Sequence, residues 1–147
     1  MSLAQFFPNL GSDYSITSPR DRRYNCIAWA AGVKETWWQP DEHGIFYWPP
    51  EIPRQYTLEA YVQAFATLGY EVCDNDYLED GYEKVAIFVE GNSPEHMARQ
   101  LSSGRWTSKL GMWEDIEHAL QGLSGEKYGE VVKVLKLRRE RTGQHPS

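Results

Sequence analysis

The run Lys84-Val85-Ala86-Ile87-Phe88-Val89 is the most strand-like stretch of this sequence, because β-branched and aromatic residues dominate it. A Gly91-Asn92-Ser93-Pro94 break follows, and two further strand-like segments then flank the short loop Ser102-Ser103-Gly104. This arrangement predicts a hairpin in which residues 101 and 105 face each other. Residue 98 then lies opposite residue 108, so that Ser108 shares a face of the sheet with His96. We therefore expect a mostly antiparallel sheet.

Helical patterns accompany these strands. A polar lead-in over residues 1–23 precedes the first of three predicted helices, which span residues 25–32, 57–68 and 114–123. Two more segments alternate like strands, at residues 70–73 and 129–137. The predicted class is α+β, with one domain over residues 1–147 that includes a lead-in at 1–20 and a polar tail at 141–147.

The composition limits the classes of function. With 147 residues, of which 41% are hydrophobic, the chain can build one core. The net charge of −6 argues against a general nucleic-acid binder, because such binding depends largely on Lys and Arg displacing counterions. No stretch approaches the roughly 18 apolar residues of a membrane span, and no secretory signal is visible. We expect a cytoplasmic protein with no membrane or nucleic-acid partner.

Cys26 follows Asn25 at the predicted start of the first helix, where unpaired backbone N–H groups favour a negative thiolate. This position predicts a thiol pKa below the roughly 8.5 of a free cysteine. Of the four histidines, His96 is best placed to exchange a proton with the thiol, because it begins a strand after the Pro94 break. His118, on the third predicted helix, is the rival.

The residue that orients the His96 ring has two main candidates. Ser108 is favoured by the hairpin register, although a hydroxyl is a weak partner for this role. Asp115 has the right charge, but it equally well caps the third predicted helix. Gln100 is a further alternative.

Four pieces of the sequence carry a resemblance to a known superfamily. They are Asn25-Cys26-Ile27-Ala28-Trp29-Ala30, Gly81-Tyr82-Glu83-Lys84-Val85-Ala86-Ile87-Phe88, His96-Met97-Ala98-Arg99 and Trp106-Thr107-Ser108-Lys109-Leu110-Gly111. Together they resemble the papain-like cysteine peptidases, nearest the compact NlpC-like and CHAP-like branches, and bacterial domains with H-x-A-R and W-x-S-K-x-G patterns. The resemblance covers about residues 20–140.

The resemblance implies a papain-like fold, in which the helix bearing Cys26 packs on a mostly antiparallel sheet of about four to six strands. It also implies that Cys26 attacks the substrate and that His96 acts as the base. The cell-wall peptidases of this group usually carry an acidic residue before the cysteine, where this chain has Asn25. The resemblance therefore bears on the fold more than on the substrate.

Several polar and aromatic side chains near Cys26 are candidates for substrate binding. Asn25 is expected to cap the helix, and either its amide or the Tyr24 hydroxyl is a candidate second donor to an oxyanion. Trp38 and Trp48, in an aromatic loop, could wall a substrate groove or simply pack on the core. The second cysteine, Cys73, is interpreted as structural.

The leading hypothesis is a thiol-dependent amide hydrolase or acyl transferase acting on a peptide or another amide-containing substrate. The alternatives are a catalytically inactive papain-like domain that binds a peptide or protein, and a structural partner of another protein through the aromatic loop. No metal-ligand spacing and no glycine-rich phosphate loop occurs in the sequence, so no cofactor is expected.

Overall fold

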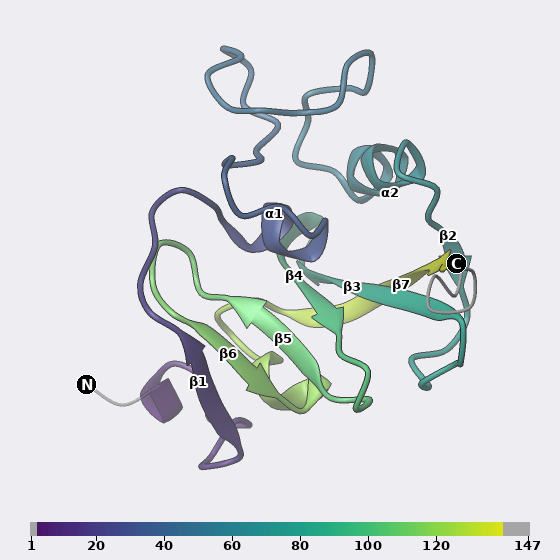
Figure 1. The fold of residues 1–147 in the computed structure, drawn as a ribbon. Coiled ribbons are helices and arrows are strands. Elements are labelled where there is room, and N and C mark those ends of the chain that lie inside the picture. Colours follow the sequence, from purple (N-terminus) through teal and green to yellow (C-terminus); the bar gives the residue numbers. More distant parts are fainter. Residues whose placement is uncertain (1–2, 140–147) are drawn as a thin grey trace.

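A single seven-stranded sheet organises the chain in the computed structural model, which describes residues 3–139 (Figure 1). The strand order is β1-β6-β5-β4-β3-β7-β2, and every neighbouring pair is antiparallel. The strands are β1 (Tyr14–Ser18), β2 (Glu71–Cys73), β3 (Tyr82–Glu90), β4 (Ser93–Gln100), β5 (Trp106–Lys109), β6 (Asp115–His118) and β7 (Glu130–Arg138). The predicted polar tail at 141–147 lies outside the described residues.

The predicted papain-like architecture, with an N-terminal helix packed on about four to six strands, is wrong. Seven strands form the sheet, and the only α-helices within residues 3–139 are two short ones, α1 (Cys26–Ala30) and α2 (Leu58–Ala66). Two segments account for the difference. The lead-in contributes the edge strand β1, and the third predicted helix is replaced by strand β6 and a 3-10 turn.

Residues 115–118 form a strand, although their spacing predicts a helix. The reason is that strands β1 and β5 pair with β6 on its two sides. Ile116 lies opposite Ile16 of β1 on one side and opposite Ser108 of β5 on the other. The four-residue spacing of Ile116 and Leu120 arises from a strand that continues into the 3-10 helix η2 (Leu120–Leu123). Pairing on two sides therefore overrides the local helical pattern.

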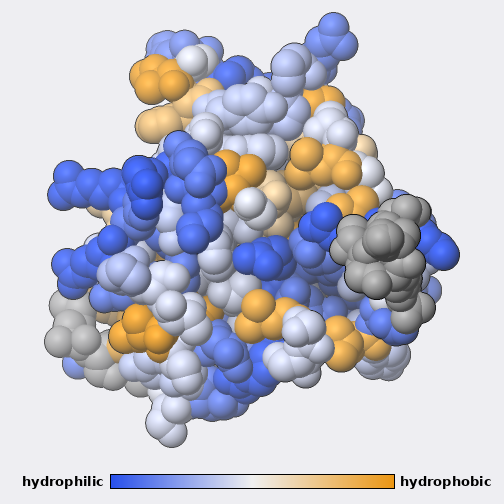
Figure 2. Space-filling model, viewed as in Figure 1, coloured by the Kyte–Doolittle hydropathy of each residue, from blue (hydrophilic) through white to orange (hydrophobic). Residues whose placement is uncertain are grey.

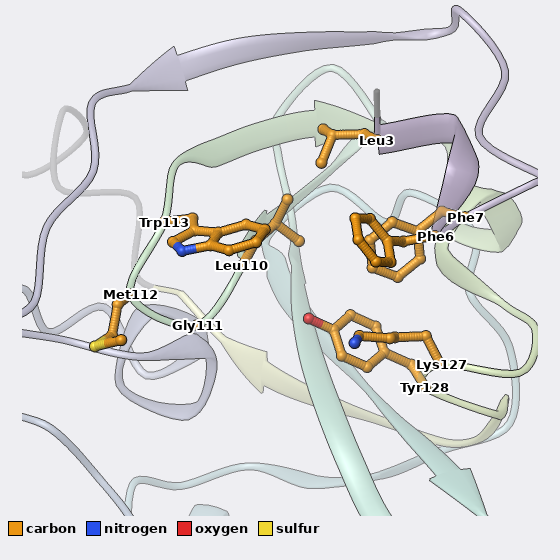
Figure 3. Close-up of a pocket in the computed structure, with 9 residues that line it drawn as sticks. All are labelled: Leu3, Phe6, Phe7, Leu110, Gly111, Met112, Trp113, Lys127 and Tyr128. Carbon is orange, nitrogen blue, oxygen red and sulfur yellow. The ribbon is translucent and has the colours of Figure 1, made fainter. Parts of the chain in front are cut away.

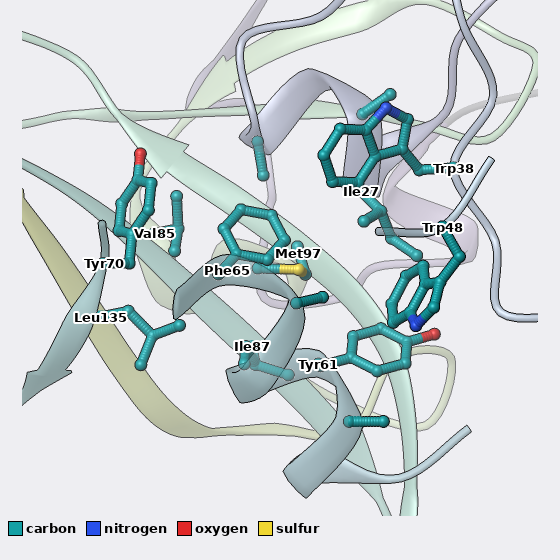
Figure 4. Close-up of a cluster of buried hydrophobic side chains, with 14 of the residues drawn as sticks. Ile27, Trp38, Trp48, Tyr61, Phe65, Tyr70, Val85, Ile87, Met97 and Leu135 are labelled. Atoms are coloured by element: carbon teal, nitrogen blue, oxygen red, sulfur yellow. The ribbon is translucent and has the colours of Figure 1, made fainter. Parts of the chain in front are cut away.

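The sheet separates two hydrophobic clusters, as the alternation of side chains along β3 requires. Val85 and Ile87 belong to the cluster under α1 and α2, whereas Ala86 and Phe88 belong to the cluster on the other face. Figure 4 shows the first cluster, in which Phe65 of α2 lies beside Met97 of β4. The 3-10 helices η1 (Leu3–Gln5) and η2 lie with the second cluster.

Both α-helices begin at the residues that the sequence indicates. The Asn25 side chain accepts a hydrogen bond from the Ala28 N–H at 3.2 Å, and Thr57 caps α2 in the same way through Ala60 at 3.1 Å. Helix α1 contacts strands β4 and β5. The cap therefore fixes the position of Cys26 against the middle of the sheet.

The face of the molecule seen in Figure 2 is mostly polar. Figure 2 shows apolar groups on one face as separate spots among hydrophilic residues. Within residues 3–139, no helix combines the length and the apolar character that crossing a membrane requires.

Candidate functional site

The Cys26 thiol lies where α1 meets β4. The backbone N–H groups of Met97 and Ile27 interact with its sulfur, and Met97 is the neighbour of His96 along β4. Burial nevertheless raises the pKa of the Cys26 thiol to about 11, because loss of water disfavours the thiolate more than these N–H groups favour it. The predicted pKa below that of a free cysteine is therefore wrong, and Cys26 is a neutral thiol at pH 7.

A hollow of about 300 Å³ opens beside Cys26. Its lining residues are Asn25, Cys26, Ile27, Gln39, Tyr56, Tyr61, Ser93, Pro94 and Glu95. Trp38 and Trp48 are not among them, because both are buried in the core with exposed fractions of 5% and 3%, which is the second of the two alternatives considered for them. The aromatic loop therefore supplies packing at these two positions.

The His96 ring is enclosed on the opposite face of the sheet from α1. Tyr128 stacks on it with the ring centroids 4.1 Å apart and the planes 3° from parallel, and the edge contact with Phe88 is 5.3 Å. Burial lowers the pKa of His96 well below its usual value, and the nearby His118 lowers it further. His96 is therefore a neutral imidazole in the folded protein.

Ser108 forms a hydrogen bond with one nitrogen of this ring. The His96 Nε2 atom lies 2.9 Å from the Ser108 Oγ atom, and both residues are almost completely buried. The hairpin register expected from the loop is confirmed by the pairs Arg99–Thr107 and Gln100–Trp106. The expected contact of Ser108 with His96 is confirmed as well, whereas its catalytic role stays a prediction.

His118 extends this contact into a chain of hydrogen bonds whose direction can be worked out. The His118 Nδ1 atom is 2.7 Å from the carbonyl oxygen of Ala119, which only accepts, so Nδ1 carries the proton. Burial lowers the pKa of His118 to about 4, so its Nε2 atom is unprotonated at neutral pH. That atom lies 2.7 Å from Ser108 Oγ, and the Ser108 hydroxyl must therefore donate to it.

The tautomer of His96 follows from this chain. Because the single hydroxyl proton of Ser108 points to His118, the Ser108 oxygen must accept a hydrogen bond from the Nε2–H group of His96. A neutral imidazole protonated at Nε2 has a bare lone pair at Nδ1. The His96 Nδ1 atom is buried and has no hydrogen-bond partner among residues 3–139. The His96 Nδ1 atom is therefore a buried, unprotonated nitrogen.

Asp115 does not take part in this chain. Its Oδ2 atom accepts a hydrogen bond from the Tyr24 hydroxyl at 2.8 Å, and it caps no helix because β6 replaces the predicted one. Lys109 lies over the Tyr24 ring at 4.8 Å and donates to the carbonyl oxygens of Asp21 and Gly111, each at 2.6 Å. This buried cluster anchors the segment that leads to Cys26.

The two side chains considered as oxyanion donors are also engaged. Asn25 Nδ2 donates to the Trp38 carbonyl oxygen at 2.6 Å, and the Tyr24 hydroxyl donates to Asp115. Gln100, the further alternative for orienting His96, donates instead to the Asp76 carbonyl oxygen at 3.0 Å. The backbone N–H groups around Cys26 therefore remain the candidates for stabilising an oxyanion.

Two residues of this site were missed by the sequence reasoning. Tyr128, which covers His96, stands in a turn with no motif that could have indicated its role. His118 was assigned to a helix, where it appeared only as a rival to His96. An expectation of strand at residues 115–118 would have placed His118 one strand away from Ser108, within reach of its hydroxyl.

The other possible functions of the polar side chains are limited. Within the part of the chain that the structure describes, no three His, Cys, Asp or Glu side chains are grouped to hold a metal ion. Cys73 is buried as a free thiol, with its sulfur 3.2 Å from the Asn75 carbonyl oxygen. Its surroundings agree with the structural interpretation.

Comparisons with known proteins identify the family of this chain. Curated proteins and solved structures give no match. A family model described as a domain of unknown function, DUF7689, matches residues 15–136, and the chain therefore belongs to the DUF7689 family.

Proposed function

We propose that this domain is a thiol-dependent amide hydrolase or acyl transferase, with Cys26 as nucleophile and His96 as general base. One observation carries the proposal. The hydrogen-bond chain from Ala119 through His118 and Ser108 leaves the His96 Nδ1 atom bare, and the N–H group of the next residue, Met97, contacts the Cys26 thiol.

The chemical steps assign a role to each of these groups. The Cys26 sulfur attacks the carbonyl carbon of the amide while the thiol proton moves to His96 Nδ1. As the carbon–nitrogen bond breaks, His96 returns this proton to the departing amine, which leaves a thioester on Cys26. Water, or an acceptor amine in the transferase reaction, then attacks the thioester with His96 again as base. Ser108 keeps the ring oriented throughout.

The raised pKa of Cys26 decides the form of this mechanism. Both partners are neutral at rest, because burial raises the pKa of the thiol and lowers the pKa of His96. Cys26 also makes no hydrogen bond to His96 in the described part of the chain, and the His96 ring lies on the other face of the sheet, so the proton must pass between them through a bridging water molecule or substrate group. Attack therefore relies on the base rather than on a thiolate that already exists.

Acylation of Cys26 by p-nitrophenyl acetate tests the proposal. We expect the first-order acylation rate to be nearly constant between pH 6 and pH 8, because His96 stays neutral throughout this range. Replacement by His96→Gln should lower the rate at pH 7 by at least about 100-fold, the usual contribution of a general base. Release of p-nitrophenol and the mass of the labelled peptide provide the measurement.

Cys73→Ser is the matched control, since it removes the other free thiol and should leave the rate unchanged. A rate that rises tenfold with each pH unit would show attack by a free thiolate without a base, and the enzymatic role would then be abandoned. Equal labelling of Cys26 and Cys73 would lead to the same conclusion.

A binding role without turnover is the second candidate. The raised pKa of the Cys26 thiol favours it, because a buried neutral thiol is typical of cysteines that only pack. The hollow beside Cys26 would then receive a peptide without cleaving it. The acylation experiment separates the two candidates, since a binding domain gives no acceleration that depends on His96.

A further inference from the structure

A second pocket lies on the other side of His96 from the Cys26 hollow, and Tyr128 joins it to the candidate site. Tyr128 stacks on the His96 ring and also lines this pocket of about 300 Å³. The other lining residues are Leu3, Phe6, Phe7, Leu110, Gly111, Met112, Trp113 and Lys127 (Figure 3). The pKa of Tyr128 is raised, chiefly by burial.

The lining has an unusual division between apolar and charged groups. Almost all of it is apolar or aromatic, and Figure 3 shows the Trp113, Leu110 and Phe6 side chains around one space. Lys127 is the single charged residue of the lining. Its ammonium lies 5.2 Å from the centre of the Phe6 ring and forms no ion pair within residues 3–139.

This lining specifies the chemistry of an occupant. An aromatic or branched aliphatic group would bury its surface against Leu110, Met112 and Trp113. A carboxylate next to that group would face the unpaired Lys127 ammonium, with no acidic lining residue to repel it. The lining of the pocket therefore favours a ligand in which an apolar group stands next to one carboxylate.

We propose that this pocket binds the C-terminal apolar residue of a peptide or acyl-amino acid, with its free carboxylate at Lys127. This inference does not depend on the proposed function, because the pocket and the Cys26 hollow share no lining residue and the stacked rings of Tyr128 and His96 lie between them.

Binding can be measured without catalysis by titrating N-acetyl-L-phenylalanine into the Cys26→Ala variant with calorimetric detection. We expect binding that is at least about threefold tighter than that of N-acetyl-L-phenylalanine amide, which lacks the charge. A modest ratio is expected because Lys127 is exposed. N-acetylglycine should bind more weakly than either, since it leaves the apolar lining uncovered.

Two pairs of variants locate the site. Lys127→Gln should abolish the preference for the acid, whereas Lys136→Gln, which removes a lysine 4.5 Å from the Tyr82 ring on another surface, should retain it. Met112→Ala should weaken binding of the phenylalanine derivative, whereas Val132→Ala, at an equally exposed apolar residue, should not.

Equal affinity for the acid and the amide, or full affinity after Lys127→Gln, would overturn the proposed ligand. Because Cys26 is absent from the titrated protein, these results are independent of the acylation experiment. Binding as expected together with failure of His96-dependent acylation would retain the pocket and reject the enzyme. Acylation without binding would retain the enzyme and reject this ligand.

Discussion

Gly129→Ala is expected to destabilise the protein by about 4 kcal/mol or more, which is exceptional for the addition of one methyl group. A Cβ atom at Gly129 would lie 2.0 Å from the carbonyl oxygen of Val89 and 2.7 Å from the amide nitrogen of Glu90. These atoms belong to the backbone at the end of β3, so no side chain can rotate away. Gly129 also has a φ of 77°, which disfavours any residue with a Cβ atom.

The Gly129→Ala substitution should also disturb the candidate site. Gly129 exchanges two backbone hydrogen bonds with Gly125, at 3.0 and 2.7 Å, and it directly follows Tyr128, which stacks on His96. Relief of the clash requires the turn to move away from β3. That movement would carry Tyr128 away from the imidazole.

Gly44→Ala is the matched control, because Gly44 has a similar φ of 71° but open space around its Cα atom. Conformational strain alone should cost about 1 kcal/mol there. Urea unfolding of both variants measures the difference in the free energy of unfolding. If the two substitutions cost the same, the close approach of Val89 to Gly129 would be incorrect.

The sequence predicts those features that depend on neighbouring residues. The loop Ser102-Ser103-Gly104 determines the register of β4 and β5, and this register brings Ser108 to His96. The caps Asn25 and Thr57 likewise depend on the residues three positions later. Such local geometry can be worked out without knowledge of the rest of the fold.

Features that depend on distant partners could not be predicted in this way. Strand β1 lies at the edge of the sheet with Ile16 59% exposed, so it lacks the apolar alternation of a half-buried strand. Strand β6 becomes a strand because β1 and β5 pair with it. The pKa of Cys26 follows the same rule, since the burial that raises it comes from the sheet under α1 and outweighs the effect of the helix start.

Acidification from pH 7 to pH 5 is expected to lower the free energy of unfolding by about 4 kcal/mol, with about 2 kcal/mol from each of His96 and His118. Both imidazoles are neutral in the folded protein, because burial lowers the pKa of His118 to about 4 and that of His96 well below its usual value. In the unfolded chain each has a pKa of about 6.5 and takes up a proton as the pH falls. The unfolded state therefore binds more protons below pH 6.5. Stability is fully present above this value and is lost as the pH decreases towards about 4.

His118→Gln should remove about half of this pH dependence, because glutamine does not titrate and its side-chain oxygen can still accept the hydrogen bond from Ser108. His43→Gln is the control, since the His43 side chain is 75% exposed and the substitution should leave the pH dependence unchanged. Urea unfolding at half-unit steps between pH 5 and pH 7.5 gives the slope, in a range where Asp and Glu contribute little because they titrate near pH 4. An unchanged slope in His118→Gln would mean that His118 is protonated in the folded protein. The direction assigned to the hydrogen bonds of Ser108 would then be wrong, and so would the conclusion that the His96 Nδ1 atom is unprotonated.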